Sequence, residues 1–360
     1  MNRFNDPRYK HAAYNFITFR ARLLNAFAGS VSGGLLAKLA AATGLVMEEG
    51  LTTLQQTYPV PIPTGGFREA KKPRQFDRWS ERSITGGTLP FEAGFAEELK
   101  KLTRPGPVAT LFNSPNKATQ LGQSAQALLD NLLCKRLMAG SSTKHGYDDD
   151  FFFKASKKIH PDMPNSPTYG NKHSLTLKKA NPIDFVREVN KKCKAVPHPA
   201  HSTHAPHWMD QQLAAILCPE DAFDILEDVA VKDELRVTVT SGSATNTVVE
   251  VNKWKGKFTP IEARHLASNK AYAFTRGPGA EAGLLVHSLM GIESLPGGDF
   301  MASVDWRAET GTWMMPRIWE LGPNTEYAII NKEVLIGGDL DVDAILFAPW
   351  SVHEIDLTIE

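Results

Sequence analysis

The sequence predicts an α+β fold, in which a basic N-terminal half rich in helices and loops precedes an acidic C-terminal half rich in β-strands. In the first half, apolar residues recur at helical spacing, and Pro and Gly interrupt the helical runs. In the second half, β-branched residues alternate with polar ones at a period of two. Apolar residues make up 42% and charged residues 22% of the 360 residues, which excludes a mostly disordered chain.

Two helices are predicted near the N-terminus, over residues 9–28 and 35–47, with a pair of glycines between them. The uncharged stretch Leu23–Ala37 has 15 residues. A membrane-spanning helix needs about 20, so this stretch is not predicted to cross a membrane. Because residues 1–47 are basic and poor in acids, two alternatives stay open: an organellar transit peptide and a segment that binds a membrane surface.

The next part of the chain alternates between irregular segments and helices. Residues 58–90 are interrupted repeatedly by Pro and Gly, which predicts a long irregular segment of the kind that often has a binding role. A short helix is predicted over residues 91–103. The clearest helix covers residues 117–139, where leucines form a wide apolar stripe and Gly140 follows as a C-cap candidate.

Further helices are predicted after the polar, irregular residues 140–181. One covers residues 182–195. A helix pair follows over residues 208–217 and 219–230, the second with Pro219 at its first turn. Acidic residues come directly after this proline, where they complement the positive end of the helix dipole.

Four strands are predicted in the C-terminal part, where alternating or β-branched residues are bounded by glycine-containing turns. They cover residues 235–240, 247–251, 300–306 and 352–359. The chain shows no internal repeat of fixed period.

These elements divide the chain into three predicted regions. Residues 1–57 form a helical arm, residues 58–230 a basic helix-and-loop region, and residues 231–360 an acidic β-rich region. The alternative is a single domain in which the three regions intertwine.

A net charge of zero hides a strong imbalance along the chain. Residues 1–210 hold 29 Lys and Arg against 17 Asp and Glu, whereas residues 211–360 hold 11 against 23. Such asymmetry fits a polyanionic partner, or a head-to-tail contact between copies that propagates into a ring, shell or filament. It also fits two oppositely charged surfaces that pair inside one chain.

The cysteine pattern indicates reduced thiols. Three cysteines, Cys134, Cys193 and Cys218, are an odd number at spacings that match no paired zinc motif. We expect free thiols, two of them buried, in a protein of the cytoplasm or of an assembled particle.

Four histidines at an unbroken spacing of three form the most distinctive local motif. Prolines disfavour an α-helix here, and a polyproline II segment of this spacing places all four imidazoles along one edge. Imidazoles and a nearby thiolate are zinc ligands, and the alternative is a polar, pH-sensitive surface loop. The predicted metal ligands are Cys193, His198, His201, His204 and His207.

A second motif mixes cations with aromatic rings between residues 67 and 82. Cations neutralise phosphates and aromatic rings stack on bases, so the mixture favours single-stranded nucleic acid. Acids interspersed in the segment leave a solvated loop as the alternative. The predicted nucleic-acid-binding residues are Arg68, Lys71, Lys72, Arg74, Arg78, Trp79 and Arg82.

The sequence contains neither a phosphate-cradling glycine loop nor a dinucleotide-binding fingerprint. The leading hypothesis is therefore a non-catalytic structural subunit, capsid-like or ribonucleoprotein-like, that self-assembles as a homo-oligomer through charge-complementary surfaces. Its expected partners are copies of itself and nucleic acid, and no cofactor is expected. The alternative is a zinc-dependent hydrolase or toxin-like effector in which the histidine run holds zinc and activates water.

Overall fold

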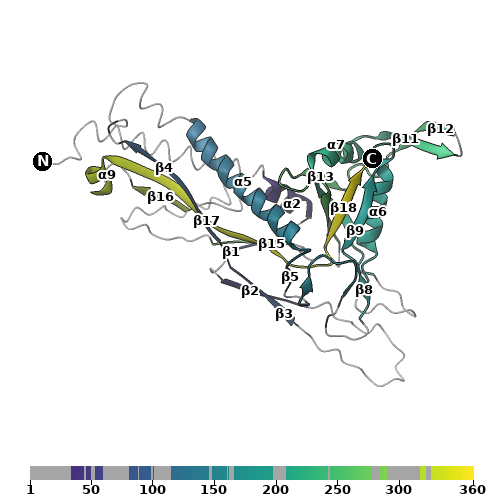
Figure 1. Ribbon diagram of the computed structural model, residues 1–360, viewed down its shortest axis with the longest axis horizontal. Coiled ribbons are helices and arrows are strands. Elements are labelled where there is room, and N and C mark those ends of the chain that lie inside the picture. Colours follow the sequence, from purple (N-terminus) through teal and green to yellow (C-terminus); the bar gives the residue numbers. More distant parts are fainter. Residues whose placement is uncertain are drawn as a thin grey trace, which may run out of the picture.

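The computed structural model confirms the predicted α+β class, and the predicted contrast between the two halves stays a prediction. Helices and sheets of mixed strand direction alternate along the part of the chain that the structure describes (Figure 1). The described residues are 34–43, 46–49, 53–59, 81–87, 89–98, 100, 115–145, 148–159, 161, 166–197, 208–241, 244–277, 284–289, 317–321 and 326–360. The helices are α2 (Leu35–Thr43), α5 (Pro115–Ala139), α6 (Pro182–Lys194), α7 (Glu220–Val231) and α9 (Glu326–Asn331).

A five-stranded mixed sheet organises one lobe of the molecule. Its middle pairs are antiparallel, whereas each edge strand runs parallel to its neighbour. In spatial order its strands are β13 (Thr259–Glu262), β10 (Gln212–Cys218), β14 (Lys270–Arg276), β18 (Val352–Ile359) and β9 (Lys172–Leu177). The sheet joins strands from both sides of residue 230, and the predicted region boundaries stay a prediction.

Helices cover both faces of this sheet. Alternate residues of β10 face opposite ways, so Ile216 packs with α6 and α7, whereas Leu217 packs with α2 and the C-terminal part of α5. We call this three-layer unit the sandwich lobe. A third apolar cluster, which includes Trp350, Met209 and Val196, closes one end of it.

A second sheet extends from the sandwich lobe along α5 toward α9 (Figure 1). The C-terminal end of its longest strand, β17 (Glu333–Leu346), enters the core, where Val342 and Ala344 are buried. Two hydrogen bonds from the side chain of Arg136 in α5 to the carboxylate of Asp343 (3.0 and 2.8 Å) hold this end in place. The strands of this sheet are β1 (Val46–Glu49), β15 (Leu284–Leu289), β17, β16 (Arg317–Leu321) and β4 (Leu89–Glu98).

Short two-stranded pairs complete the described part of the chain. One hairpin, β11 (Glu234–Ser241) with β12 (Ala244–Val251), projects from the sandwich lobe beside α7 (Figure 1). The other pairs are β2 (Thr53–Pro59) with β3 (Glu81–Gly87), β5 (Lys144–His145) with β6 (Asp150–Phe151), and β7 (Lys157–Lys158) with β8 (Thr168–Tyr169).

Several predicted elements are confirmed. The helices predicted over 117–139, 182–195 and 219–230 correspond to α5, α6 and α7, and the strands predicted at 235–240, 247–251 and 352–359 to β11, β12 and β18. The helix predicted over 35–47 ends at Thr43 and is followed by β1. The helix predicted over 9–28 and the strand predicted over 300–306 lie outside the described residues.

Two predicted helices are wrong. The sequence predicts a helix over residues 91–103, but Leu89–Glu98 form β4, because all ten residues of this strand pair with β17. Residues 208–217 were expected to be helical, but Gln212–Cys218 form β10. This strand is covered by helices on both faces, so its apolar run lacks the period of two that identifies a half-exposed strand.

Gly140 follows α5 as predicted, but for a different reason. Among the described glycines only Gly256 and Gly277 have a positive φ, so Gly140 does not act as a left-handed cap. A Cβ atom at residue 140 would lie 2.7 Å from the ring of Phe153 and 2.9 Å from Leu346. The position therefore requires glycine because the core is close-packed around the end of the helix.

Candidate functional site

The sandwich lobe carries an open groove beside the exposed face of α6. The sequence favours this helix because Pro182 lies in its first turn, Asp184 faces the positive end of the dipole, and three lysines lie in its last turn. Its apolar residues pack against the sheet. Its outer face carries Arg187, Lys191 and Lys194, whose spacing of four and three residues places them in one row.

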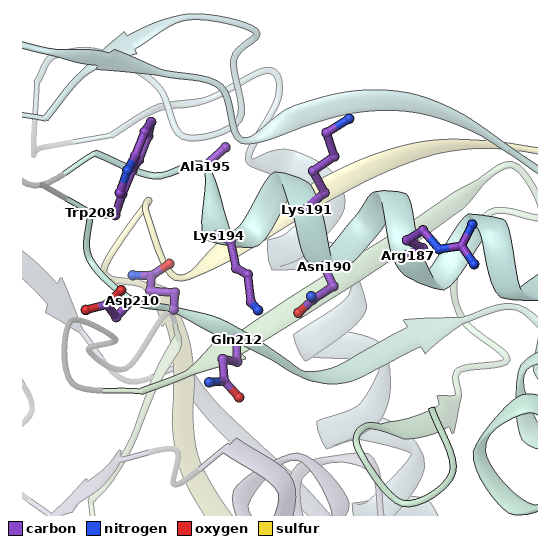
Figure 2. A pocket seen from close by; sticks show the side chains of 9 residues that line it. Arg187, Asn190, Lys191, Lys194, Ala195, Trp208, Asp210 and Gln212 are labelled. Carbon is purple, nitrogen blue, oxygen red and sulfur yellow. The ribbon is translucent and has the colours of Figure 1, made fainter. Parts of the chain in front are cut away.

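The other wall of the groove comes from the segment that leads into β10. Trp208 is 44% exposed and lies at one end of the groove, with Arg187 at the other (Figure 2). Lys194 and Asn190 extend from α6 toward the strand that carries Gln212 (Figure 2). The groove has a volume of about 670 Å³, and its lining residues are Arg187, Asn190, Lys191, Lys194, Ala195, Trp208, Asp210, Gln211 and Gln212. We call it the α6 groove.

Hydrogen bonds hold the two walls of the α6 groove together. The side-chain oxygen of Asn190 accepts a hydrogen bond from the backbone N–H of Leu213 (3.2 Å), and the N–H of Met209 donates to Val196 (3.1 Å). Asp210 has a φ of 51°. It packs against Gly277, where a Cβ atom would lie 2.7 Å from the carbonyl oxygen of Asp210. The wall is thus fixed by a strained residue and a close backbone contact rather than by a loose turn.

The charges of the groove favour an anion. Among the lining residues that the structure describes, three are cations and one, Asp210, is a carboxylate. Arg187 donates to Asp184 at 2.7 Å and Lys191 lies 3.7 Å from Glu188, but both pairs are exposed and local to the helix. Exposed pairs of this kind are worth about 0–1 kcal/mol, so a phosphate can replace the acid at little cost. A row of cations with an aromatic ring at one end can hold a chain of phosphates and stack on a base.

The predicted nucleic-acid-binding loop is untested. Its residues Arg68 to Trp79 lie outside the described residues. Arg82 lies in β3, where its backbone pairs with Tyr58 of β2. The assignment of this segment to nucleic acid therefore stays a prediction.

The predicted zinc site is only partly described. The run from His198 to His207 lies outside the described residues, and a bridge between Pro197 and Trp208 closes its two ends. Cys193 lies in the apolar cluster between α6 and the sheet, where burial raises the pKa of its thiol to about 12 and disfavours the thiolate that zinc needs. Within the described ranges, no three His, Cys, Asp or Glu side chains gather as a metal site.

The three cysteines are free thiols, as predicted, and all three are buried rather than two. Burial raises the pKa of Cys134 and of Cys218 to about 12 as well. They behave as small apolar side chains of the core rather than as nucleophiles.

The β11–β12 hairpin is the second notable surface. Its base is tied to α7, because the side chain of Asn252 donates to the carbonyls of Val229 (2.6 Å) and Lys232 (2.8 Å). Beyond the base, Val248 and Val249 are 44% and 57% exposed. Consecutive residues of a strand point to opposite faces, so this part of the hairpin is uncovered on both faces.

A buried charge network lies inside the sandwich lobe and was not predicted. The carboxylate of Glu354 is fully buried and accepts from Lys270 (2.6 Å), Lys172 (3.1 Å) and the hydroxyl of Ser141 (2.8 Å). Lys270 also donates to Asp356 (2.5 Å). Burial opposes the charge of Lys270, but its hydrogen bonds to Asp356 and Glu354 outweigh that effect and raise its pKa. The network joins three strands and the end of α5, so we assign it a structural role.

Comparison with protein-family profiles finds no match, and neither does comparison with curated protein sequences. Solved structures similar to the chain include a virus-like particle from Pyrococcus furiosus, with 11% identity over 93% of this chain and 98% of that one, and a TM-score of 0.46. The capsid of the cyanophage P-SCSP1u has 8% identity over 88% of each chain and a TM-score of 0.49. The holo-SrpI encapsulin complex from Synechococcus elongatus PCC 7942 has 10% identity over 89% and 86%, and a TM-score of 0.42.

At these identities and TM-scores the likeness carries no argument about function, which must come from the chain's own surfaces. In the stretches that the structure describes, no helix is long and apolar enough to span a membrane.

Two stacked histidines lie on the α6 side of the sheet. Nε2 of His173 in β9 lies 3.1 Å from Nδ1 of His353 in β18, and the rings are inclined by 20°. His353 is 1% exposed, and within the described residues its Nε2 has no hydrogen-bond partner. Burial, with the nearby charge of Lys192, lowers the pKa of His173 to about 4. Burial, with the charge of His173, lowers the pKa of His353 to about 3.

This histidine pair predicts acid sensitivity. In the unfolded chain both imidazoles titrate near 6.5, so below that pH the unfolded state binds more protons than the folded state. Stability is therefore expected to fall by a few kcal/mol, as an order of magnitude, between about pH 6.5 and pH 4, and to level off below about pH 3. Denaturant unfolding across this range measures the effect. His353→Phe should flatten the fall, whereas replacement of the exposed His265 by Gln should leave it unchanged. Equal curves for wild type and His353→Phe would contradict the assignment.

Proposed function

We propose that this chain is a non-catalytic structural subunit that assembles with copies of itself into a capsid-like particle. The uncovered β11–β12 hairpin carries the proposal. An isolated two-stranded hairpin is at best marginally stable in water. This one carries Val248 and Val249 exposed on opposite faces, with Val251 75% exposed beside them. A neighbouring subunit that covers these valines would supply the apolar burial that the hairpin lacks.

Charge complementarity between copies is the second part of the proposal. The charged residues on the outer face of α7 are all acids, because the helix contains no Lys or Arg. Of these acids, Asp228 pairs with Lys232 at 2.6 Å. A neighbour's basic surface would meet the remaining acids, and such a head-to-tail contact continues from copy to copy until the assembly closes. The exposed acids of α7 are Glu220, Asp221, Asp224, Glu227 and Asp228.

Nucleic acid is the partner that we propose for the basic segment between residues 68 and 82. The support is its composition, in which cations alternate with rings. The excess of Lys and Arg before residue 210 extends the positive potential over a larger part of the chain.

The mass of the native protein tests this proposal. Light scattering on a sizing column, on protein that has not been treated with nuclease, should give a large particle of defined mass. The ratio of absorbance at nucleic-acid and protein wavelengths then reports whether the particle contains nucleic acid.

A further inference from the structure

We infer that the α6 groove binds single-stranded nucleic acid, with Arg187, Lys191 and Lys194 on successive phosphates and the ring of Trp208 stacked on a base. The inference goes beyond the proposed function, which places nucleic acid on a different segment. It rests on side chains that the structure describes and on no property of an assembled particle.

The first argument is the length of the cationic row. Arg187 and Lys194 are seven residues apart, and an α-helix rises about 1.5 Å per residue, so the row extends about 10 Å. A strand that keeps the stacking of a duplex advances about 3.4 Å per nucleotide along its axis, so the row spans about three nucleotides stacked in this way. Lysine and arginine at this spacing can each meet a different phosphate.

The second argument is that the cations are available. Within the described residues Lys194 forms no ion pair, and the partners of Arg187 and Lys191 are acids of the same helix, one turn earlier. The opposing carboxylate in the groove, Asp210, is exposed to water, which weakens its interaction with the row. Bound phosphates therefore displace only local, exposed pairs.

The third argument is the position of the tryptophan. Trp208 lies at the Lys194 end of the row, beyond the end of the helix (Figure 2). The next residue, Met209, is buried in the third apolar cluster, and the backbone of Trp208 pairs with that of Pro197. The indole ring is therefore attached to a fixed backbone. Stacking on an indole needs an unpaired base, which favours a single strand over a duplex.

Binding of a fluorescently labelled oligothymidine of about ten nucleotides to the full-length protein tests the inference. The variant Lys191→Gln/Lys194→Gln removes two groove cations. Lys179→Gln/Lys192→Gln is the matched control, because it removes the same charge from exposed lysines that do not line the groove. The groove variant should lower the affinity at least tenfold and reduce the salt slope by about 1.4, at about 0.7 per phosphate contact. The control should keep both values near those of the wild type.

Trp208 variants separate stacking from charge. Trp208→Ala should weaken oligothymidine binding about 5- to 150-fold, which corresponds to about 1–3 kcal/mol for one stacked base. Trp208→Phe, which keeps an aromatic ring, should retain most of the wild-type affinity for oligothymidine. Heparin, a polyanion without bases, should bind the wild type and Trp208→Ala equally.

Two results would overturn the inference. If both lysine variants lost the same affinity, the binding would be nonspecific attraction to the whole basic surface. If Trp208→Ala bound oligothymidine like the wild type, the cationic row of α6 would be a binding site for a different anion, such as the acidic face of α7 on another copy. Light scattering on the same samples reports assembly independently, so a monomer that binds through the groove would contradict the proposed function alone.

Discussion

Replacing Glu354 by alanine is expected to destabilise the protein by about 3–5 kcal/mol. The carboxylate is completely buried and holds the ammonium groups of Lys270 and Lys172, whose side chains are only 22% and 33% exposed. Without it, Lys172 loses its ion pair, the hydroxyl of Ser141 loses its acceptor, and Lys270 keeps only Asp356, all in a place that water reaches poorly. The denaturant midpoint, followed by tryptophan fluorescence, measures the loss.

Glu360→Ala is the matched control for this prediction. Glu360 directly follows the last residue of β18, and its side chain is 59% exposed and 3.7 Å from Lys178. An exposed pair of this kind contributes about 0–1 kcal/mol. If Glu354→Ala moved the unfolding midpoint no further than Glu360→Ala, the network would not contribute to stability as described.

The double variant Val249→Lys/Val251→Lys is expected to prevent assembly while leaving the fold intact. These valines are 57% and 75% exposed in the single chain, so their replacement removes little buried area and should change stability by no more than about 0.5 kcal/mol. In an assembled particle the same positions would place two ammonium groups inside an apolar contact, at a cost of several kcal/mol per contact. The mass from light scattering should fall to that of one chain.

Ala267→Lys/Ser268→Lys is the control for the hairpin. It adds the same charge at two exposed positions in the turn before β14. This variant should assemble like the wild type. A hairpin variant that still formed the wild-type particle, with unchanged circular dichroism, would show that the hairpin is not an assembly contact.

The elements that the sequence predicted well are those whose signal is local. Helix α6 begins at a proline, and Ile183, Val186, Val189 and Cys193 repeat at helical spacing on its buried face. Helix α5 has a leucine stripe wide enough to identify it without its partners. In each helix, the helix propensity of the residues and the apolar pattern agree.

The two strands that were predicted as helices depend on partners far away in the chain. The segment around Phe91 and Phe95 becomes β4 because β17, more than 230 residues later, pairs with it. The segment around Ile216 becomes β10 because β13 and β14 flank it and helices cover both its faces. An apolar run that is buried on all sides has no exposed face to reveal its period.

The candidate site was predictable only in part. The basic row of α6 is visible in the sequence as cations at positions 187, 191 and 194. The contribution of Trp208 is not visible in the sequence, because only the bridge between Pro197 and Trp208 brings this residue back to the end of the helix after the histidine run. The pairing of His173 with His353 spans 180 residues, so no local pattern could indicate it.

The mass of the native protein in solution tests whether the chain assembles with copies of itself. Light scattering on a sizing column, with absorbance recorded for protein and for nucleic acid, gives both the number of copies and any bound nucleic acid. We expect a large, homogeneous particle that contains many copies of the 39.6 kDa chain. A monomer at every concentration would contradict it, because the valines of the β11–β12 hairpin would then stay exposed in the working protein.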